Sequence, residues 1–304
     1  MSHKKGIRQH YVPVGYLKFF SICPKRPRKK LQIWRSESIN RIENKIKPRK
    51  IHIPKKPKKI VRVAHEKHFL EKEVDEELKK LENDILRYIQ DIIDTKEVKN
   101  KSVTLLIGNL PLKDDKFPLF LYIGCQALRT CYWRNLLAPF YNYSQEDLKK
   151  KQSQQFLPLI RNSAPIYLPE WGIPEGFNLD GDRLDDFSHR LIIHTELILL
   201  INRTEMNFIT SDNPVVWIDD IDLEIDKALK PHILFPLSPK IAILLALKTD
   251  KIPNKICIIN NPHNILKCNI RIWEECEKEI YAYQKNDLVT LKEHRIKKKI
   301  SSKF

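Results

Sequence analysis

Apolar residues recur at two different periods along this 304-residue chain. From His65 onward they recur every three or four residues, a spacing typical of an amphipathic helix; the positions are Leu70, Val74, Leu78, Leu81, Ile85, Tyr88, Ile89 and Ile92. Similar patterns predict further helices over 119–137 and 183–202. In the C-terminal third, short β-prone runs instead predict strands at 208–211, 215–218, 232–237, 241–247 and 255–260. A helix over about 262–277 and a strand over 279–283 are predicted to follow.

Helices that precede strands indicate the α+β class. We therefore expect long N-terminal helices packed on a C-terminal, mainly antiparallel sheet. The prediction is a single domain over 1–284 that contains a basic, Lys- and Pro-rich insert at 24–64, followed by a basic tail at 285–304. Within the insert, residues 31–34 ("LQIW") are typical of a short strand.

The composition excludes several classes of protein. Only 7 of 304 residues are glycine, and neither G-x-G-x-x-G nor G-x-x-x-x-G-K occurs, which argues against glycine-rich phosphate loops. The six cysteines form no C-x-x-C pair, residues 1–20 resemble no signal peptide, and no apolar run is long enough for a membrane span. We expect a soluble, cytoplasmic protein with reduced thiols.

The charge is concentrated at the two ends of the chain. Residues 1–64 hold 20 Lys and Arg against two acidic residues, and residues 285–304 hold seven against two, whereas residues 65–284 carry a net charge of −6. Basic ends on a mildly acidic body suggest a nucleic-acid partner bound through the insert and the tail, because Lys and Arg neutralise phosphates. An AT-rich genome, which accumulates surface lysine, is the alternative explanation.

Five segments together resemble a known family. They are "RQHYVPVGYLKFF" (8–20), "LEND" (81–84), "QALRT" (126–130), "NFITSDNPV" (207–215) and "FPLSPK" (235–240). Their order and the opening Q-H-Y-V-P-x-x-Y-L-x-x-F pattern are similar to the bacterial domain-of-unknown-function family 4238. The resemblance implies that these positions belong to one domain, and it implies no activity. The basic insert is the clearest departure from the pattern.

The "TSDNP" segment offers the most concentrated chemistry. A strand that ends at Ser211 would deliver Asp212 and Asn213 to the rim of the fold, and Pro214 restricts Asn213 to an extended conformation. Asp212 could serve as general base, metal ligand or orienting partner of His10, with Ser211 and Asn213 as hydrogen-bonding groups. Alternatively, Asp212 caps its own backbone in an Asx-turn.

Gln126 and Arg129 lie three residues apart on a strongly apolar predicted helix, and so share one face. A buried arginine needs a carboxylate or a bound anion to offset the loss of its hydration. Arg129 is thus either a clamp for a substrate anion or one half of a structural pair with Glu82 or Asp212.

Histidines add weaker candidates. His10, near the start of the chain, could transfer a proton or bind a metal ion, or could make one structural hydrogen bond. His65 and His68 form H-x-x-H, but no third zinc ligand stands at a recognised spacing. His194 could face the site alone, and Lys240 could contact a phosphate, although a solvated lysine is the simpler interpretation.

Two functions from different classes follow. The first is a nucleic-acid- or nucleotide-directed hydrolase, such as a nuclease- or phosphodiesterase-like toxin or defence effector. Its predicted catalytic residues are His10, Glu82, Asp212 and Asn213, its substrate-binding residues are Gln126, Arg129 and Ser211, and a divalent metal is a candidate cofactor. The second is a non-catalytic nucleic-acid-binding protein whose buried polar groups are structural. The sequence leaves oligomeric state open.

Overall fold

The structure is a computed structural model of the chain. It describes residues 8–10, 12–22, 30–39, 50–51, 53–59, 65–67, 72–94, 195–218, 232–247 and 256–301, together with residues 119, 122, 123 and 126.

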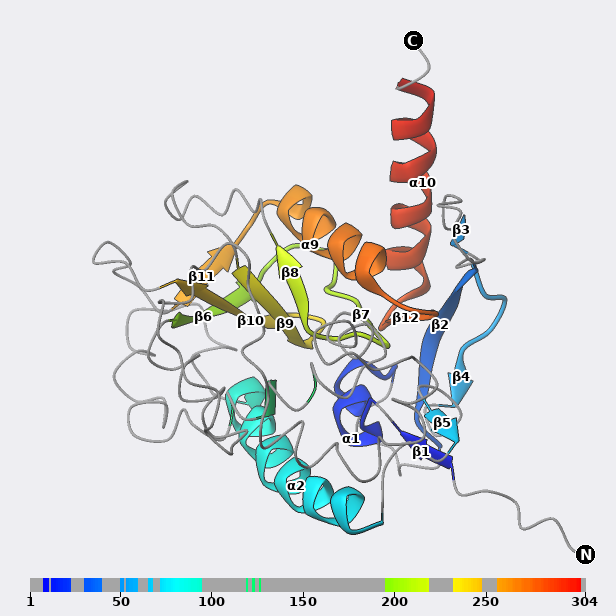
Figure 1. The fold of residues 1–304 in the computed structure, drawn as a ribbon. Coiled ribbons are helices and arrows are strands. Elements are labelled where there is room, and N and C mark those ends of the chain that lie inside the picture. Colours follow the sequence, from blue (N-terminus) through cyan, green and yellow to red (C-terminus); the bar gives the residue numbers. More distant parts are fainter. Residues whose placement is uncertain are drawn as a thin grey trace, which may run out of the picture.

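A five-stranded sheet forms the centre of the described fold (Figure 1), with the order β11-β6-β10-β9-β8. Its strands are β6 (Thr195–Asn202), β8 (Val216–Ile218), β9 (His232–Ser238), β10 (Ile241–Leu247) and β11 (Ile256–Ile259). Every neighbouring pair in it is antiparallel except β11 and β6, which run parallel.

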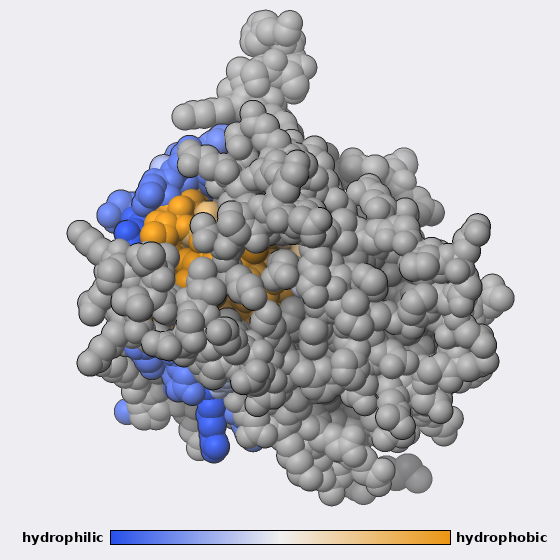
Figure 2. Space-filling view, turned by 90° about the vertical axis from the view of Figure 1, so that its left-hand side faces the viewer, coloured by the Kyte–Doolittle hydropathy of each residue, from blue (hydrophilic) through white to orange (hydrophobic). Residues whose placement is uncertain are grey.

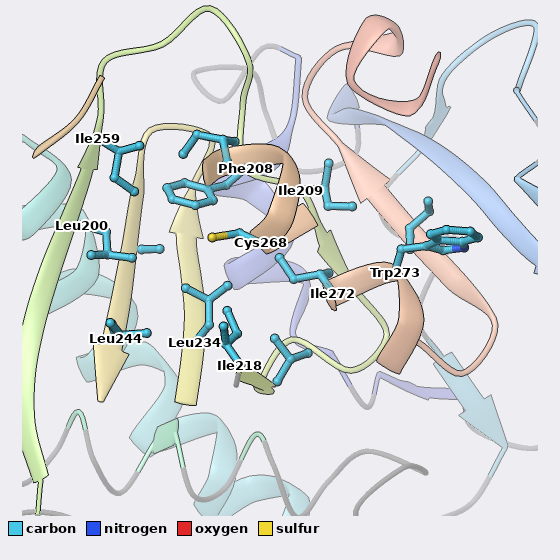
Figure 3. Close-up of a cluster of buried hydrophobic side chains, with 14 of the residues drawn as sticks. Leu200, Phe208, Ile209, Ile218, Leu234, Leu244, Ile259, Cys268, Ile272 and Trp273 are labelled. Atoms are coloured by element: carbon cyan, nitrogen blue, oxygen red, sulfur yellow. The ribbon is translucent and has the colours of Figure 1, made fainter. Parts of the chain in front are cut away.

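Both faces of this sheet are covered. Leu234 and its neighbour Leu244 face helix α9 (Pro262–Glu275), where Cys268 and Ile272 close the core (Figure 3). Figure 3 also shows Phe208 and Ile209, from the loop that follows β6, in this core, with Leu200, Ile218, Ile259 and Trp273 around them. The next residue along β9, Phe235, points to the opposite face, because side chains alternate along a strand. There it meets Tyr16 and Tyr122.

Short N-terminal elements cover that opposite face. Helix α1 (Val14–Leu17) continues into the 3₁₀ helix η1 (Lys18–Phe20), and α1 packs on helix α2 (Lys72–Asp94). A β-carbon at Gly15 would overlap the side chain of Leu86, so the two helices approach closely where α1 has no side chain.

A second sheet, of order β3-β2-β12-β7, joins distant parts of the chain. It contains β2 (Gln32–Ile39), β3 (Lys50–Ile51), β7 (Thr210–Ser211) and β12 (Glu279–Ala282), and β4 (Lys58–Lys59) also pairs with β2. Helix α10 (Lys285–Ser301) follows β12 and stands beside β3 (Figure 1). Separately, β1 (Arg8–His10) pairs with β5 (His65–Lys67).

The predicted helix over 183–202 is wrong in its second half, because residues 195–202 form strand β6. Leu197 to Ile201 are all buried, with at most 4% of each residue exposed. A strand covered on both faces loses the alternation of apolar and polar residues, so periodicity cannot distinguish it from a buried helix. Residues 183–194 lie outside the described residues.

Other predictions hold in part. The other strands and the helix expected after residue 207 are confirmed, but the strand expected over 208–211 is limited to Thr210–Ser211. The strand expected over 31–34 is found as the longer β2. The first helix begins at Lys72 rather than His65, because His65–Lys67 form β5. Of residues 119–137, those described are helical. Residues 285–301, expected only as a basic tail, form α10.

The α+β class is therefore confirmed, with a mainly antiparallel arrangement of strands. The expectation of several long N-terminal helices is not supported, since α1 has four residues and η1 has three.

On the side that carries β11, apolar residues reach the surface between hydrophilic ones (Figure 2), and Cys257 and Ile258 of β11 are half-buried. Among the described helices, none has the length and apolar character needed to cross a bilayer.

Candidate functional site

Asp212 lies in the interior, not at an open rim, with 1% of the residue exposed. Its carboxylate accepts three backbone hydrogen bonds, from Glu277 N at 2.8 Å, Lys278 N at 2.6 Å and Glu279 N at 3.0 Å. The N–H groups of Glu277 and Lys278 belong to the connection between α9 and β12, and that of Glu279 belongs to the first residue of β12. Asp212 thus fixes the turn by which the chain leaves α9.

Its neighbours complete the same turn. Ser211 Oγ donates to Asn213 O (2.6 Å) and accepts from Asn213 N (3.1 Å), which makes a local turn. The side-chain amide of Asn213 donates to the carbonyl oxygen of Glu275 at 3.3 Å, and so satisfies a backbone group at the end of α9. In place of the Asx-turn considered as an alternative, the carboxylate of Asp212 caps a distant segment.

Burial raises the pKa of Asp212 from its ordinary value of 3.8 to about 7. The three backbone N–H groups oppose this rise because they favour the charged carboxylate, and the nearby charge of Glu279 adds to it. A carboxyl group with such a pKa has the affinity for protons that a general base needs at neutral pH. Both of its oxygens, however, already accept bonds from the backbone.

Tyr16 is the meeting point of three of the family-like motifs. Its hydroxyl is 2.8 Å from Thr210 Oγ1 and donates to the carbonyl oxygen of Pro236 at 2.6 Å. Its ring stacks on Phe235 with centroids 5.3 Å apart. The opening signature, "TSDNP" and "FPLSPK" are therefore joined at one fully buried phenol, whose pKa is raised by burial. The sequence offered a signal, since all three motifs stood in the resemblance, but no pattern singled out this tyrosine.

Gln126 lies on the helical segment that also carries Tyr122, one turn earlier. Tyr122 meets Phe235 edge to face, with ring centroids 6.0 Å apart. Gln126 is fully buried, and among the described residues neither its amide nitrogen nor its amide oxygen has a hydrogen-bond partner. An unpaired buried amide costs about 1–3 kcal/mol, so this side chain is either a local defect or awaits a polar partner.

The remaining predicted site residues are not brought to Asp212 by the described contacts. Glu82 is half-buried on α2. Backbone pairing sets His10 opposite His65, and the side chain of neither histidine is described. Arg129 lies outside the described residues, as do His68 and His194. Of the predicted site residues that the structure describes, Ser211, Asp212 and Asn213 lie together.

A second set of buried polar side chains holds the loop between β6 and β7. Asn207 donates through its backbone and side chain to Asp287 of α10, at 3.2 and 3.3 Å. Asn269 of α9 donates to Asn207 O (2.8 Å) and accepts from Ile209 N (3.0 Å). Sequence reasoning missed these residues, because a single Asn in a loop or in α9 and a single Asp in the charged helix α10 leave no spacing pattern.

The same loop also explains Lys240. Its ammonium donates to Thr204 O at 2.6 Å, and partial burial lowers its pKa. Thr204 is in turn bound to Asn202 Oδ1 through its backbone and its hydroxyl. This arrangement favours a structural role over the phosphate contact considered for Lys240.

The described residues offer no metal centre, in that no three His, Cys, Asp or Glu side chains among them come together in a way that could hold an ion. The candidate divalent metal therefore stays a prediction about the rest of the chain.

The basic ends of the chain meet at the second sheet. In the insert, Lys55, Lys56, Lys58 and Lys59 are exposed. Strand β4 pairs with β2, and β3 of the same insert packs against α10, whose Lys285 and Lys292 are also exposed. We call these six lysines the basic face. The nearest acids of α10 differ in exposure, since Asp287 is buried while Glu293 is exposed.

Comparison with known proteins gives one match. Residues 8–286 match the model of a family described as "Protein of unknown function (DUF4238)". No curated protein and no solved structure matches the chain.

Proposed function

Since the chain belongs to the DUF4238 family, as its motifs suggested, and that family's description states no activity, the function has to be inferred from the fold; we propose that this protein binds nucleic acid through the basic face. The supporting observation is the contact between β3 and α10, which joins the two basic ends of the chain.

Co-location is what separates this proposal from genomic lysine bias. Lysine that accumulates without a partner has no reason to gather from two ends of a chain onto one surface. Here residues 50–59 hold five lysines and no acidic residue, and strand β3 within them contacts α10, which lies in the C-terminal segment of net charge +5. Like charges placed side by side repel, so such a cluster is best explained by a polyanion that neutralises it.

The acidic body gives the proposal a direction. Residues 65–284 carry a net charge of −6, so a nucleic acid is attracted to the basic face and repelled by the rest of the surface. A ligand that approaches is thus steered to one side of the molecule.

Hydrolysis of the bound nucleic acid is the second candidate function. Two observations favour it: the unpartnered amide of Gln126 and the pKa of about 7 of Asp212. The hydrogen bonds of Ser211, Asp212 and Asn213 favour the non-catalytic alternative, since all three side chains already bind backbone groups. Binding without turnover therefore ranks first.

A salt titration tests the binding function. We expect affinity for a fluorescein-labelled oligonucleotide to fall steeply between 50 and 200 mM salt, because each neutralised phosphate releases counterions. The double variant Lys58→Glu/Lys59→Glu should weaken binding and flatten the salt dependence. Arg87→Glu on α2, an equally exposed change of charge outside the basic face, is the matched control and should have little effect. Affinity that ignores salt, or equal losses in both variants, contradicts the proposal.

A hydrolysis assay then separates the two candidates. If Asp212 is a base, Asp212→Asn abolishes cleavage of the oligonucleotide and spares affinity. If Asp212 only caps the turn after α9, the same variant lowers stability and reveals no cleavage to lose.

A further inference from the structure

Trp34 of β2 is packed against the core and also lies beside a cation. It is half-buried on β2, with one side packed against the core cluster that contains Leu288 and Leu291 of α10. The ammonium of Lys285 stands over its ring, 6.0 Å from the centroid. An indole that is partly exposed next to a cation, on the surface of a sheet, differs from an ordinary core tryptophan.

Lysines and a small residue surround this ring. Lys59 of β4 is paired with Gln32 of β2, which is two residues from Trp34 and therefore on the same face. Diagonal neighbours of this kind lie about 7–8 Å apart, within reach of long side chains. On the β12 side of β2, the residue opposite Trp34 is Ala282, which is fully buried.

We propose that Trp34 is a base-stacking residue for single-stranded nucleic acid, with Lys59 and Lys285 on the adjoining phosphates. The inference rests on the proposed binding function and names its ligand class. An aromatic ring between basic side chains is the combination that holds single strands, because a strand without a partner offers both a charged backbone and free base faces. In a duplex the base faces are already stacked on one another, so an exposed indole would gain little there.

The position of Lys285 fits this role. It occupies the electron-rich face of the ring, which is the face that a base would stack against. Lys285 is exposed and at the first position of α10, so its ammonium can turn outward to a phosphate while the base takes its place on the ring. Lys285 thus exchanges its contact with the ring for a contact with a phosphate, and the ring exchanges Lys285 for a base.

A simpler role for the same contact is structural, in that Trp34 and Lys285 anchor the start of α10 to the sheet. The two roles differ in which ligand Trp34→Ala affects. The base-stacking role predicts weaker binding of a single strand with duplex binding spared, whereas loss of an anchor for α10 would weaken both. Phenylalanine keeps an aromatic surface, so Trp34→Phe should retain part of the single-strand affinity.

The test compares a labelled 12-nucleotide single strand of thymidines with a duplex of the same length. We expect Trp34→Ala to weaken single-strand binding about 5-fold to 150-fold, as loss of one stacked base would, with little change in salt dependence. Trp34→Phe should weaken it less, and duplex binding should change little in either variant. Trp217→Phe, at a half-buried tryptophan of β8 outside the basic face, is the matched control and should bind like wild type.

Fluorescence keeps the test decisive if Trp34→Ala folds poorly. The single strand should quench tryptophan emission of the wild type more than that of Trp34→Phe, because only Trp34 stacks on a base. Equal quenching, or single-strand affinity that Trp34→Ala leaves unchanged while Lys58→Glu/Lys59→Glu reduces it, overturns the stacking role and leaves the binding function in place. A preference for the duplex overturns the single-strand assignment. Absence of binding by the wild type overturns both proposals.

Discussion

The loop over 203–213 buries the polar side chains of Asn207 and Asp212, whereas the basic face exposes its lysines. In the loop, the side chains of Asp212 and Asn207 are buried, and they bind the segment after α9 and Asp287 of α10. On the basic face, the side chains of Lys58 and Lys59 are exposed to solvent, and the indole of Trp34 is partly exposed. The difference teaches that the buried polar groups of the loop are used within the fold, whereas the lysines of the basic face are exposed.

The largest effect should follow from Asp212→Ala. Removing the carboxylate leaves the N–H groups of Glu277, Lys278 and Glu279 without this partner at the end of α9. We expect a loss of about 3–5 kcal/mol in the free energy of unfolding, as for other broken buried polar groups. Urea denaturation measures it, and a loss below about 1 kcal/mol would show that the turn does not depend on Asp212.

The pH dependence of stability should report the same carboxyl group. Its pKa is raised in the folded protein to about 7, so the folded state binds the proton more tightly than the unfolded state does. Its contribution is then complete below about pH 4 and is lost as the pH rises to 7, at up to about 1.4 kcal/mol per pH unit. Wild type minus Asp212→Asn, measured by urea denaturation from pH 4 to 7.5, isolates it. A difference that grows with pH would mean that the backbone N–H groups outweigh burial.

Tyr16→Phe should have a smaller effect in the same direction. It removes one hydroxyl and leaves the carbonyl of Pro236 and the hydroxyl of Thr210 without that partner, while the stacking on Phe235 remains. We expect a loss of about 1–3 kcal/mol. Phe20→Leu, which changes packing beside Tyr16 without touching this hydroxyl, serves as a comparison in the same thermal or urea assay.

Gln126→Leu should reverse the sign. If the unpaired amide is a defect of the core, an apolar residue of similar size removes the penalty and raises stability by about 1 kcal/mol. If Gln126 instead holds a polar ligand, the variant loses activity or binding together with any such gain. Gln126→Glu, which buries a charge at the same place, controls for the size of the side chain. A clear destabilisation by leucine would contradict the view that this amide is unpaired.

The smallest effect is expected on the basic face. Lys58→Ala/Lys59→Ala removes exposed side chains of β4, so the urea midpoint should stay within error of wild type. Affinity for a single strand should nevertheless fall. A stability loss comparable to that of Tyr16→Phe would erase the contrast between the two regions.

Much of the C-terminal half could be predicted from the sequence, because its strands are short and are separated by residues such as Pro214 and Pro239 that mark turns. Strand β6 could not, since burial on both faces removes the alternation that identifies a strand. Strand β5 and helix α10 were missed for a different reason, because pairing and docking with distant segments decide them.

For the site, the sequence correctly drew attention to Ser211, Asp212 and Asn213, but placed them at an accessible rim. Local residue types state what a side chain can do. They do not state that the end of α9 arrives beside Asp212 and takes both of its oxygens, because that contact spans more than 60 residues. The sequence shows that both ends of the chain are basic. It does not show that they lie on one surface, because that depends on the contact of β3 with α10.

Strand β8 shows how a helix can set the width of a sheet. Trp217 of this outermost described strand donates its outward N–H to Glu275 at 3.2 Å, and its carbonyl accepts from Arg271 at 2.8 Å, while the two α9 side chains hold each other at 2.9 Å. Arg271 and Glu275 thus supply one donor and one acceptor, as one residue of a neighbouring strand would. A further strand, from this chain or from another copy, would have to break both contacts before it could add to β8. Helix α9 is therefore the border of the sheet as well as its cover, because Arg271 and Glu275 bind the backbone groups of Trp217.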